Sequence, residues 1–201
     1  MYSYVDRVYG WQKDFSTEND IKVLVLGNSF GRDWCNVLNE SKYADKIDIS
    51  YIDSTKLINI ENGKNRFKEA DLVFMVLEEG YGDLEYGIPN FILKYIDQNK
   101  LYVVGDKNFG TSNNLIYLHR KNENYFNYTV SIDKKILQRN TKLHNFYGDR
   151  YIDIINSLKD ENGKIRVFTD NDKFISWDCR HLTQDGAKYL SKVIDLTFLE
   201  R

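Results

Sequence analysis

The stretch "IKVLVLGNSFGRDW", Ile21 to Trp34, decides the fold. Residues 21–26 are an apolar run of Ile, Val and Leu around one Lys, which is typical of a strand buried on both faces of a sheet. The run ends at Gly-Asn-Ser. Apolar residues then return at helical spacing: Phe30, Trp34, Val37 and Leu38. The sequence therefore predicts a buried strand, a tight turn and a helix over residues 30–39, with Ser29 between strand and helix.

Strands and helices alternate along the rest of the chain. Four more strands are expected, over residues 46–52, 70–77, 101–104 and 151–155. Helices are expected over residues 85–98, 131–147 and 183–198, and a short extended piece over 164–169. This alternation indicates a three-layer α/β sandwich with a central, mostly parallel five-stranded sheet. We expect residues 1–20 to be an N-terminal lead-in and residues 21–201 to be a single domain.

Composition narrows the function classes. The chain has 201 residues and a formal net charge of -2, so it does not call for nucleic acid as a partner. No apolar run is long enough to span a bilayer, and the N-terminus lacks the pattern of a signal peptide, which makes the cytoplasm the default location. Cys35 and Cys179 form neither a disulfide framework nor a zinc-type spacing. We expect no metal and no organic cofactor.

Ser29 is a candidate nucleophile. Ligands of parallel α/β sheets bind outside the carboxyl ends of the strands, and Ser29 follows the end of the first strand. A serine hydroxyl needs a nearby base, and that base needs an orienting carboxylate. His181 has Asp178 three residues before it and the N-cap candidate Thr183 two residues after it, whereas His119 and His144 have no carboxylate at that spacing. The pattern predicts a catalytic triad of one serine, one histidine and one aspartate.

Two sequence blocks resemble the SGNH (GDSL-type) hydrolases. They are "GNS" at residues 27–29 and "DCRHLTQDGA" at residues 178–187. The closest likeness is to the SGNH domains found with acyltransferase family 3 proteins, which modify bacterial surface glycans. The resemblance covers residues 21–198 and implies an SGNH/flavodoxin-like fold, with Ser29 as nucleophile and with His181 and Asp178 completing the triad.

The resemblance also implies an activity and a setting. The activity is that of a serine-dependent acyl ester hydrolase or acyltransferase, acting on O-acetyl groups of a bacterial surface saccharide or on a small ester. The implied partner is a membrane acyltransferase. A domain belonging to such a protein would work outside the cytoplasm. The sequence does not choose between water and a sugar hydroxyl as acyl acceptor.

The sequence departs from the family pattern at two points. The usual Gly-Asp-Ser has Asn28 in place of its Asp, and the Gly-x-Asn block expected after the third strand is not evident in "LEEGYGD" at residues 77–83. Candidates for the second oxyanion donor are the backbone N–H of Gly80 or Gly82 and the side-chain amide of Asn108. The missing block leaves an alternative function open, a catalytically degenerate SGNH-fold module that binds glycan or a partner protein.

Aromatic residues in the predicted rim loops have two interpretations. Tyr81, Tyr86 and Phe109 follow predicted strands, where their faces can stack on sugar rings or pack into the interior. The sequence alone leaves both interpretations open.

Overall fold

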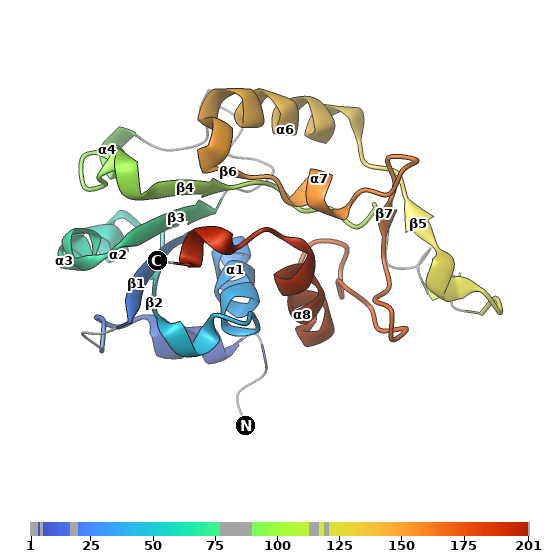
Figure 1. Ribbon diagram of the computed structural model, residues 1–201, viewed down its shortest axis with the longest axis horizontal. Helices are drawn as coiled ribbons and strands as arrows, with labels where there is room; N and C mark the ends of the chain where they lie inside the picture. Colours follow the sequence, from blue (N-terminus) through green and yellow to red (C-terminus); the bar gives the residue numbers. More distant parts are fainter. Residues whose placement is uncertain are drawn as a thin grey trace.

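A parallel sheet organises the part of the chain that the structure describes (Figure 1). The structure is a computed structural model that describes residues 4, 6–16, 20–76, 90–112, 117–118 and 121–200. The sheet strands are β1 (Ile21–Gly27), β2 (Ile47–Asp53), β3 (Leu72–Val76), β4 (Leu101–Val104) and β6 (Tyr151–Ile152). Their order is β2-β1-β3-β4-β6, and every neighbouring pair is parallel. The predicted five-stranded α/β fold is confirmed.

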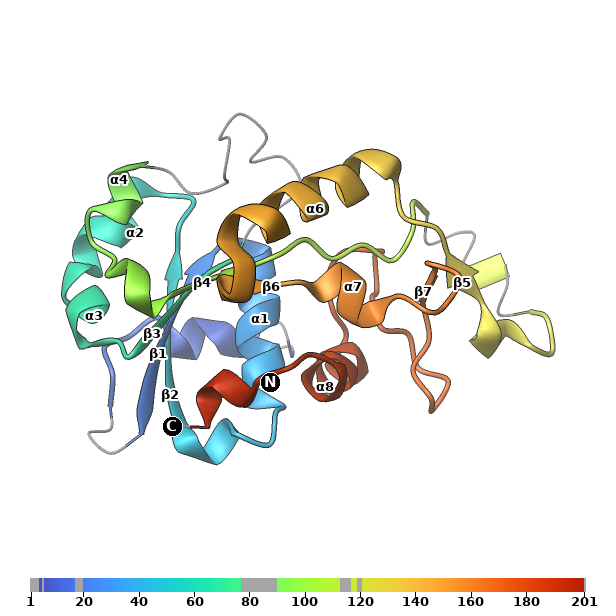
Figure 2. The same cartoon turned by 45° about the horizontal axis from the view of Figure 1, so that its top comes forward.

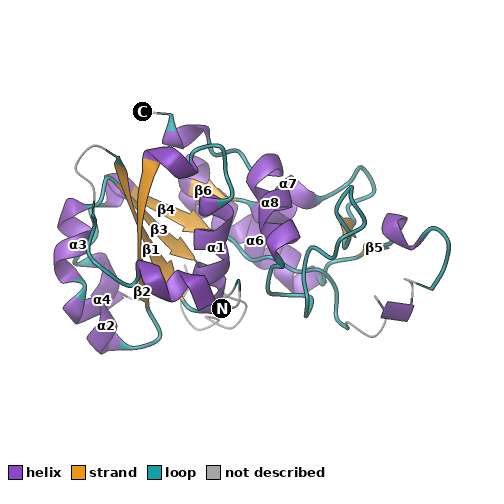
Figure 3. Cartoon of the chain, turned by 90° about the horizontal axis from the view of Figure 1, so that it is seen from below, coloured by secondary structure: helices purple, strands orange, loops and turns teal. Residues whose placement is uncertain are grey.

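Helices cover both faces of the sheet. One face carries α1 (Ser29–Asn39), α7 (Ile154–Leu158) and α8 (Gln184–Val193). The opposite face carries α2 (Leu57–Asn62), α3 (Lys64–Glu69) and α4 (Asn90–Leu93), as Figure 3 shows. The longest helix, α6 (Lys134–Tyr147), contacts the β6 edge. Short 3₁₀ helices span Asp6–Trp11, Ala44–Lys46, Gln98–Lys100, Tyr125–Asn127, Gly148–Arg150 and Thr197–Leu199.

The first strand is buried on both of its faces. Val23 and Val25 pack into the core under α1 and α8, while Leu24 and Leu26 pack into the core under α2 and α3. All four side chains are fully buried. Because successive side chains of a strand point to opposite faces, a strand between two helical layers has no polar side. This is the physical reason for the apolar run in the sequence.

The sheet also fixes the place where a ligand can bind. The chain leaves β1 for β2 on one side and returns to β3 on the other side. The order of strands therefore reverses at β1, and in open α/β sheets such a reversal opens a crevice at the carboxyl ends of the strands. Ser29 begins α1 at this end of β1.

A second, smaller sheet was not predicted. It pairs β5 (Thr129–Val130) with β7 (Ile165–Arg166) in antiparallel fashion and extends away from the main sheet (Figure 2). Two-residue strands carry no periodicity that a sequence pattern can detect. Phe168 and Phe174 pack against each other beside this small sheet, with ring centroids 4.5 Å apart.

The largest differences in element boundaries are in two predicted helices and one predicted strand. The helix predicted over 85–98 is, within the described residues, only α4, and the chain beyond it turns through bonds from Tyr95 N–H to Ile92 and from Ile96 N–H to Leu93. The strand predicted over 151–155 stops after two residues, because Asp153 caps α7. The helix predicted over 183–198 ends at Val193, although Ile194 and Leu196 beyond that point remain buried.

The described residues of the N-terminal segment contact the domain. Val8, in the first 3₁₀ helix, is fully buried in the core that lies under α1. The division at residue 20 stays a prediction. Among the helices of the described residues, none has the length and apolar character that crossing a bilayer requires.

Candidate active site

The turn between β1 and α1 presents Ser29 at the first position of a helix. Asn28 is the N-cap residue, and its side-chain oxygen accepts a hydrogen bond from the Phe30 N–H at 2.8 Å. The Gly27 carbonyl accepts hydrogen bonds from the Ser54 N–H and the Tyr51 hydroxyl. The amide that replaces the family's aspartate therefore has a local role, which is to cap the helix that begins with Ser29.

A glycine makes this turn tight. A Cβ atom on Gly27 would lie 2.9 Å from the Gly31 Cα atom and 3.2 Å from the Val76 Cβ atom. Real Cβ atoms do not approach a backbone atom that closely, so the first turn of α1 packs directly on the end of β1. Ser29 is held between these two rigid elements.

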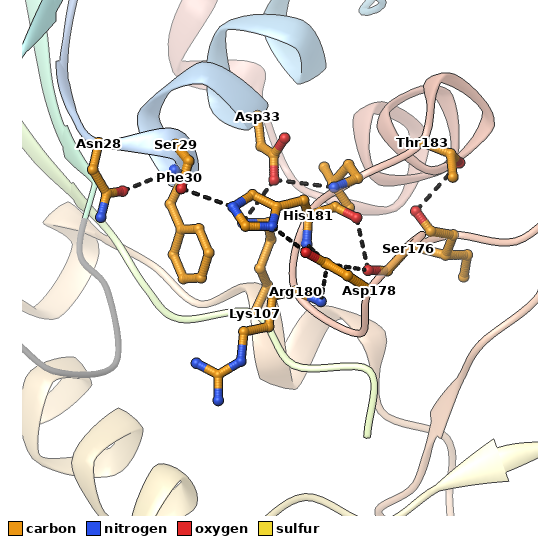
Figure 4. A network of polar contacts seen from close by, with 12 residues as sticks. Asn28, Ser29, Phe30, Asp33, Lys107, Ser176, Asp178, Arg180, His181 and Thr183 are labelled. Carbon is orange, nitrogen blue, oxygen red and sulfur yellow. Dashed lines mark hydrogen bonds and ion pairs between the residues drawn. The ribbon is translucent and has the colours of Figure 1, made fainter. Parts of the chain in front are cut away.

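Ser29, His181 and Asp178 form one continuous chain of hydrogen bonds (Figure 4). The distance from Ser29 Oγ to His181 Nε2 is 2.8 Å, and the distance from His181 Nδ1 to Asp178 Oδ2 is 2.5 Å. Because an ionised carboxylate can only accept, Nδ1 carries the proton and Nε2 is left to accept from the serine hydroxyl. Serine and histidine are 152 residues apart in sequence, and the structure brings them together.

The loop that carries Asp178 and His181 is held by its own hydrogen bonds. Asp178 Oδ1 accepts from the N–H groups of Arg180 and His181, at 2.9 and 2.6 Å. Burial would raise the pKa of Asp178, but these bonds and the imidazole hydrogen bond together lower that pKa. The carboxylate therefore stays ionised at neutral pH. The His181 carbonyl in turn accepts from the Ser176 hydroxyl and the Trp177 N–H.

Two further contacts fix this loop to its surroundings. Cys179 has a φ of 70°, a left-handed conformation that is uncommon for a non-glycine residue, and its carbonyl accepts from the Phe109 N–H at 2.9 Å. Thr183 is the N-cap of α8, as predicted, and its hydroxyl accepts from the Gly186 N–H at 2.9 Å. The loop thus ends in a capped helix that fixes the direction in which the chain leaves His181.

Comparison with known proteins finds a similar fold among solved structures. Neither a protein-family model nor a curated protein sequence matches this chain. Among solved structures, the periplasmic domain of a lipopolysaccharide acetyltransferase from Salmonella ser. Paratyphi A superimposes with a TM-score of 0.67. The identity is 15%, and the match covers 94% of this chain and 92% of that domain. The fold is shared with an acetyltransferase domain.

A second structure is more distant. WcbI, a polysaccharide biosynthesis enzyme, matches with a TM-score of 0.45 and 12% identity, over 87% of this chain and 68% of WcbI. The resemblance that the sequence predicted is confirmed at the level of the fold by the Salmonella domain.

Three residues beside the candidate triad were not predicted from the sequence. Asp33 and Lys107 form a buried ion pair with 2.9 Å between Lys107 Nζ and Asp33 Oδ2. Burial lowers the pKa of Lys107, while the Asp33 carboxylate acts in the opposite direction. Trp177 stacks on the His181 ring with centroids 5.5 Å apart and keeps 52% of its surface exposed. Closeness in sequence to the predicted site residues could have indicated two of them, since Trp177 precedes Asp178 and Asp33 lies one helical turn after Ser29.

Of the three predicted donors to the oxyanion, the structure describes one. Gly80 and Gly82 lie outside the described residues. Asn108 is buried in the loop after β4, where its side-chain oxygen accepts from the Gly110 N–H at 2.9 Å, so only its NH₂ group is left as a donor. Its oxyanion role stays a prediction.

Other candidate residues of the sequence analysis are also located. Phe109 is fully buried and packs in the core, while Tyr81 and Tyr86 lie outside the described residues. His144 pairs with Asp153 at 3.3 Å, and His119 is not described. Cys35 belongs to α1, and its side chain is fully buried in the core. In the described ranges, no group of three or more His, Cys, Asp or Glu side chains gathers as a metal site would require.

Proposed function

We propose that this protein is a serine-dependent acyl esterase or O-acyltransferase of the SGNH type, acting on O-acetyl groups of a bacterial surface saccharide. The observation that carries the proposal is the hydrogen-bonded chain from Ser29 through His181 to Asp178. A hydroxyl, an imidazole in the required tautomer and an ionised carboxylate, in that order, are the parts that acyl transfer through a serine nucleophile needs.

The proposed reaction has two halves. His181 Nε2 takes the Ser29 proton while Ser29 Oγ forms a bond to the ester carbonyl carbon, and the same proton is then given to the departing alcohol as the ester C–O bond breaks. The acyl-enzyme next passes its acyl group to water or to a sugar hydroxyl, whose proton goes to His181 and then back to Ser29. Asp178 stays ionised throughout and stabilises the imidazolium. No metal or organic cofactor enters this scheme.

The oxyanion would be met at the start of α1. The first N–H groups of a helix have no partner within the helix, and they carry its positive end. Since the Asn28 side chain already takes the Phe30 N–H, we assign the Ser29 N–H to the oxyanion. A second donor, from Gly80, Gly82 or the Asn108 amide, would be worth about 3 kcal/mol of the barrier.

The proposal that the substrate is a saccharide has two supports. It is supported by the fold shared with a lipopolysaccharide acetyltransferase domain and by the half-exposed Trp177 ring beside His181. Aromatic rings present apolar faces at low conformational cost, and the C–H faces of sugar rings pack on such surfaces. Association with a membrane acyltransferase, and work outside the cytoplasm, are proposals that follow from the same shared fold.

The test is turnover by the unmutated protein. An aryl acetate measures the esterase half-reaction, and an acetylated saccharide offered with a second saccharide as acceptor measures transfer. We expect acetate release from the aryl ester, and Ser29→Ala serves as the matched blank. Absence of turnover on every ester, together with measurable binding of a glycan or a partner protein, would establish the binding-module alternative instead.

A further inference from the structure

A buried ion pair lies beneath the candidate triad. The Asp33 and Lys107 side chains are 5% and 4% exposed. Removing two charges from water costs free energy that their attraction does not reliably return, so a buried pair is weak evidence for a purely stabilising role. The other contacts of Asp33 and Lys107 indicate what the pair does.

Three separate segments meet at one oxygen of the Asp33 carboxylate. Asp33 belongs to α1, four residues after Ser29, which places both on the same face of the helix. Its Oδ2 atom accepts from Lys107 Nζ and also from the Leu182 N–H, at 3.1 Å. Leu182 directly follows His181. This hydrogen bond thus joins the helix that carries Ser29 to the loop that carries His181, close to both residues.

Lys107 supplies a second link. Its Nζ atom lies 3.4 Å from the centroid of the Phe30 ring, a cation–π contact, and the Phe30 ring meets the His181 ring edge-on with centroids 5.6 Å apart. The ammonium group therefore holds in place the ring that packs against the imidazole. Figure 4 shows Phe30 and Lys107 close to His181.

We infer that Asp33 and Lys107 are positioning residues, which hold the His181 loop on α1 at the separation that proton transfer from Ser29 requires. The catalytic consequence rests on the proposed function, whereas the link itself does not. Lys107 neutralises Asp33 so that the carboxylate can accept the Leu182 N–H without leaving an uncompensated buried charge.

Two other carboxylates in the described residues act on Lys107. They are Asp178, which is bonded to His181, and Asp106, which is paired with Arg139. The hydrogen bond from the Leu182 N–H joins the loop directly to α1, in addition to the Ser29–His181 contact itself.

The experiment compares two double variants in the full chain. Asp33→Asn with Lys107→Met removes both charges but keeps a side-chain oxygen for the Leu182 N–H. Asp33→Ala with Lys107→Met removes the charges and the acceptor. Asp106→Asn with Arg139→Met is the matched control, because it removes a neighbouring charge pair without touching Leu182. Replacing Leu182 by its α-hydroxy acid gives an ester variant that lacks the N–H and needs no change at the pair, although it also weakens the His181 carbonyl as an acceptor for Ser176 and Trp177.

Three measurements are made below the unfolding temperature of each variant. They are the thermal midpoint, hydrogen exchange of the Leu182 amide, and the saturating rate of labelling by an aryl fluorophosphonate, which reacts with an activated serine. We expect the Ala/Met variant and the ester variant to be labelled about ten-fold more slowly or worse, with the half-saturating concentration unchanged. The Ala/Met variant should also exchange the Leu182 amide faster. The control should stay within about three-fold of the unmutated rate. The Asn/Met variant keeps the acceptor for the Leu182 N–H but loses the contact of Lys107 with Phe30, so its rate should lie between those of the control and the Ala/Met variant.

Two results would overturn the inference. One is equal labelling rates in the Asn/Met and Ala/Met variants when both are folded. The other is unchanged exchange of the Leu182 amide in the Ala/Met variant. If the unmutated protein is not labelled at all, the proposed function fails instead, and the exchange measurement then decides whether Asp33 holds the loop. If the Leu182 ester variant is labelled at the full rate, the positioning role is overturned, even when neither double variant folds.

Discussion

The two halves of the candidate site are built in opposite ways. Ser29 lies between a strand whose last five residues are buried and a capped helix, and its place follows from regular structure. His181 lies in an irregular loop whose shape depends on hydrogen bonds accepted by Asp178 and donated by the Ser176 hydroxyl and the Phe109 N–H. The first half should therefore be most sensitive to added bulk in the backbone. The second half should respond to the loss of single polar groups.

Removal of Ser29, the proposed nucleophile, or of His181, the proposed base, should have the largest effect. Ser29→Ala and His181→Ala should each lower kcat/KM on an aryl acetate by about 10³-fold or more, and the double variant should be no worse, because members of a triad act as a unit. His144→Ala is the control, since His144 is half-exposed and pairs with Asp153 away from Ser29. Full activity in Ser29→Ala would overturn the mechanism.

Added bulk at the strand–helix turn should have the next largest effect. Gly27→Ala puts a Cβ atom against Gly31 and Val76, which should cost about 1–3 kcal/mol of unfolding free energy and displace Ser29. Gly10→Ala is the matched control, because nothing lies within 4 Å of a Cβ atom there. Thermal unfolding and kcat/KM are the measurements. A fully active, equally stable Gly27→Ala protein would show that the turn is not rigid.

Loss of the orienting carboxylate should hurt activity less than loss of the base. Asp178→Asn still offers one side-chain oxygen, so the imidazole keeps a partner, but an amide can also stabilise the wrong tautomer. We expect kcat to fall more than KM rises, and activity to remain above that of His181→Ala. An Asp178→Asn protein that is as inactive as His181→Ala would mean that the loop has no other way to orient the ring.

The same carboxylate gives a pH dependence to stability. Because the pKa of Asp178 is lower in the folded protein than in the unfolded chain, the folded state gains stability from it above the unfolded value of about 3.9. That gain is lost as the pH falls through this value towards the folded pKa. Thermal midpoints measured from pH 6 down to pH 3 should fall less steeply in Asp178→Asn than in the unmutated protein. Parallel curves would contradict the assignment.

The smallest expected effect is at the rim of the base loop. Trp177→Ala should raise KM for an acetylated saccharide about five-fold while changing kcat/KM on a small aryl acetate by less than about two-fold, because only the sugar covers the exposed indole face. Trp177→Phe keeps a ring and should restore much of the affinity. Equal losses on both esters would assign Trp177 to the packing of His181 instead.

The same contrast explains what the sequence could predict. The strands that carry Leu24, Phe74 and Val103 are apolar because both of their faces are buried, and that signal is local. Asp178 and His181 could be paired because they are close in sequence. The ion pair between Asp33 and Lys107 could not, since its members are far apart in the chain and charged residues normally indicate a surface. Likewise, α4 and the 3₁₀ turns that follow it keep helical spacing of buried residues without forming a long helix.

The two cysteines have a practical consequence. Cys35 and Cys179 are both buried and are not joined in a disulfide, and burial raises the pKa of each thiol. Oxidants and disulfides react with thiolate, which such thiols scarcely form at neutral pH. The folded protein should thus keep the same covalent state with or without a reducing agent, so that its activity can be compared directly under cytoplasm-like and envelope-like redox conditions.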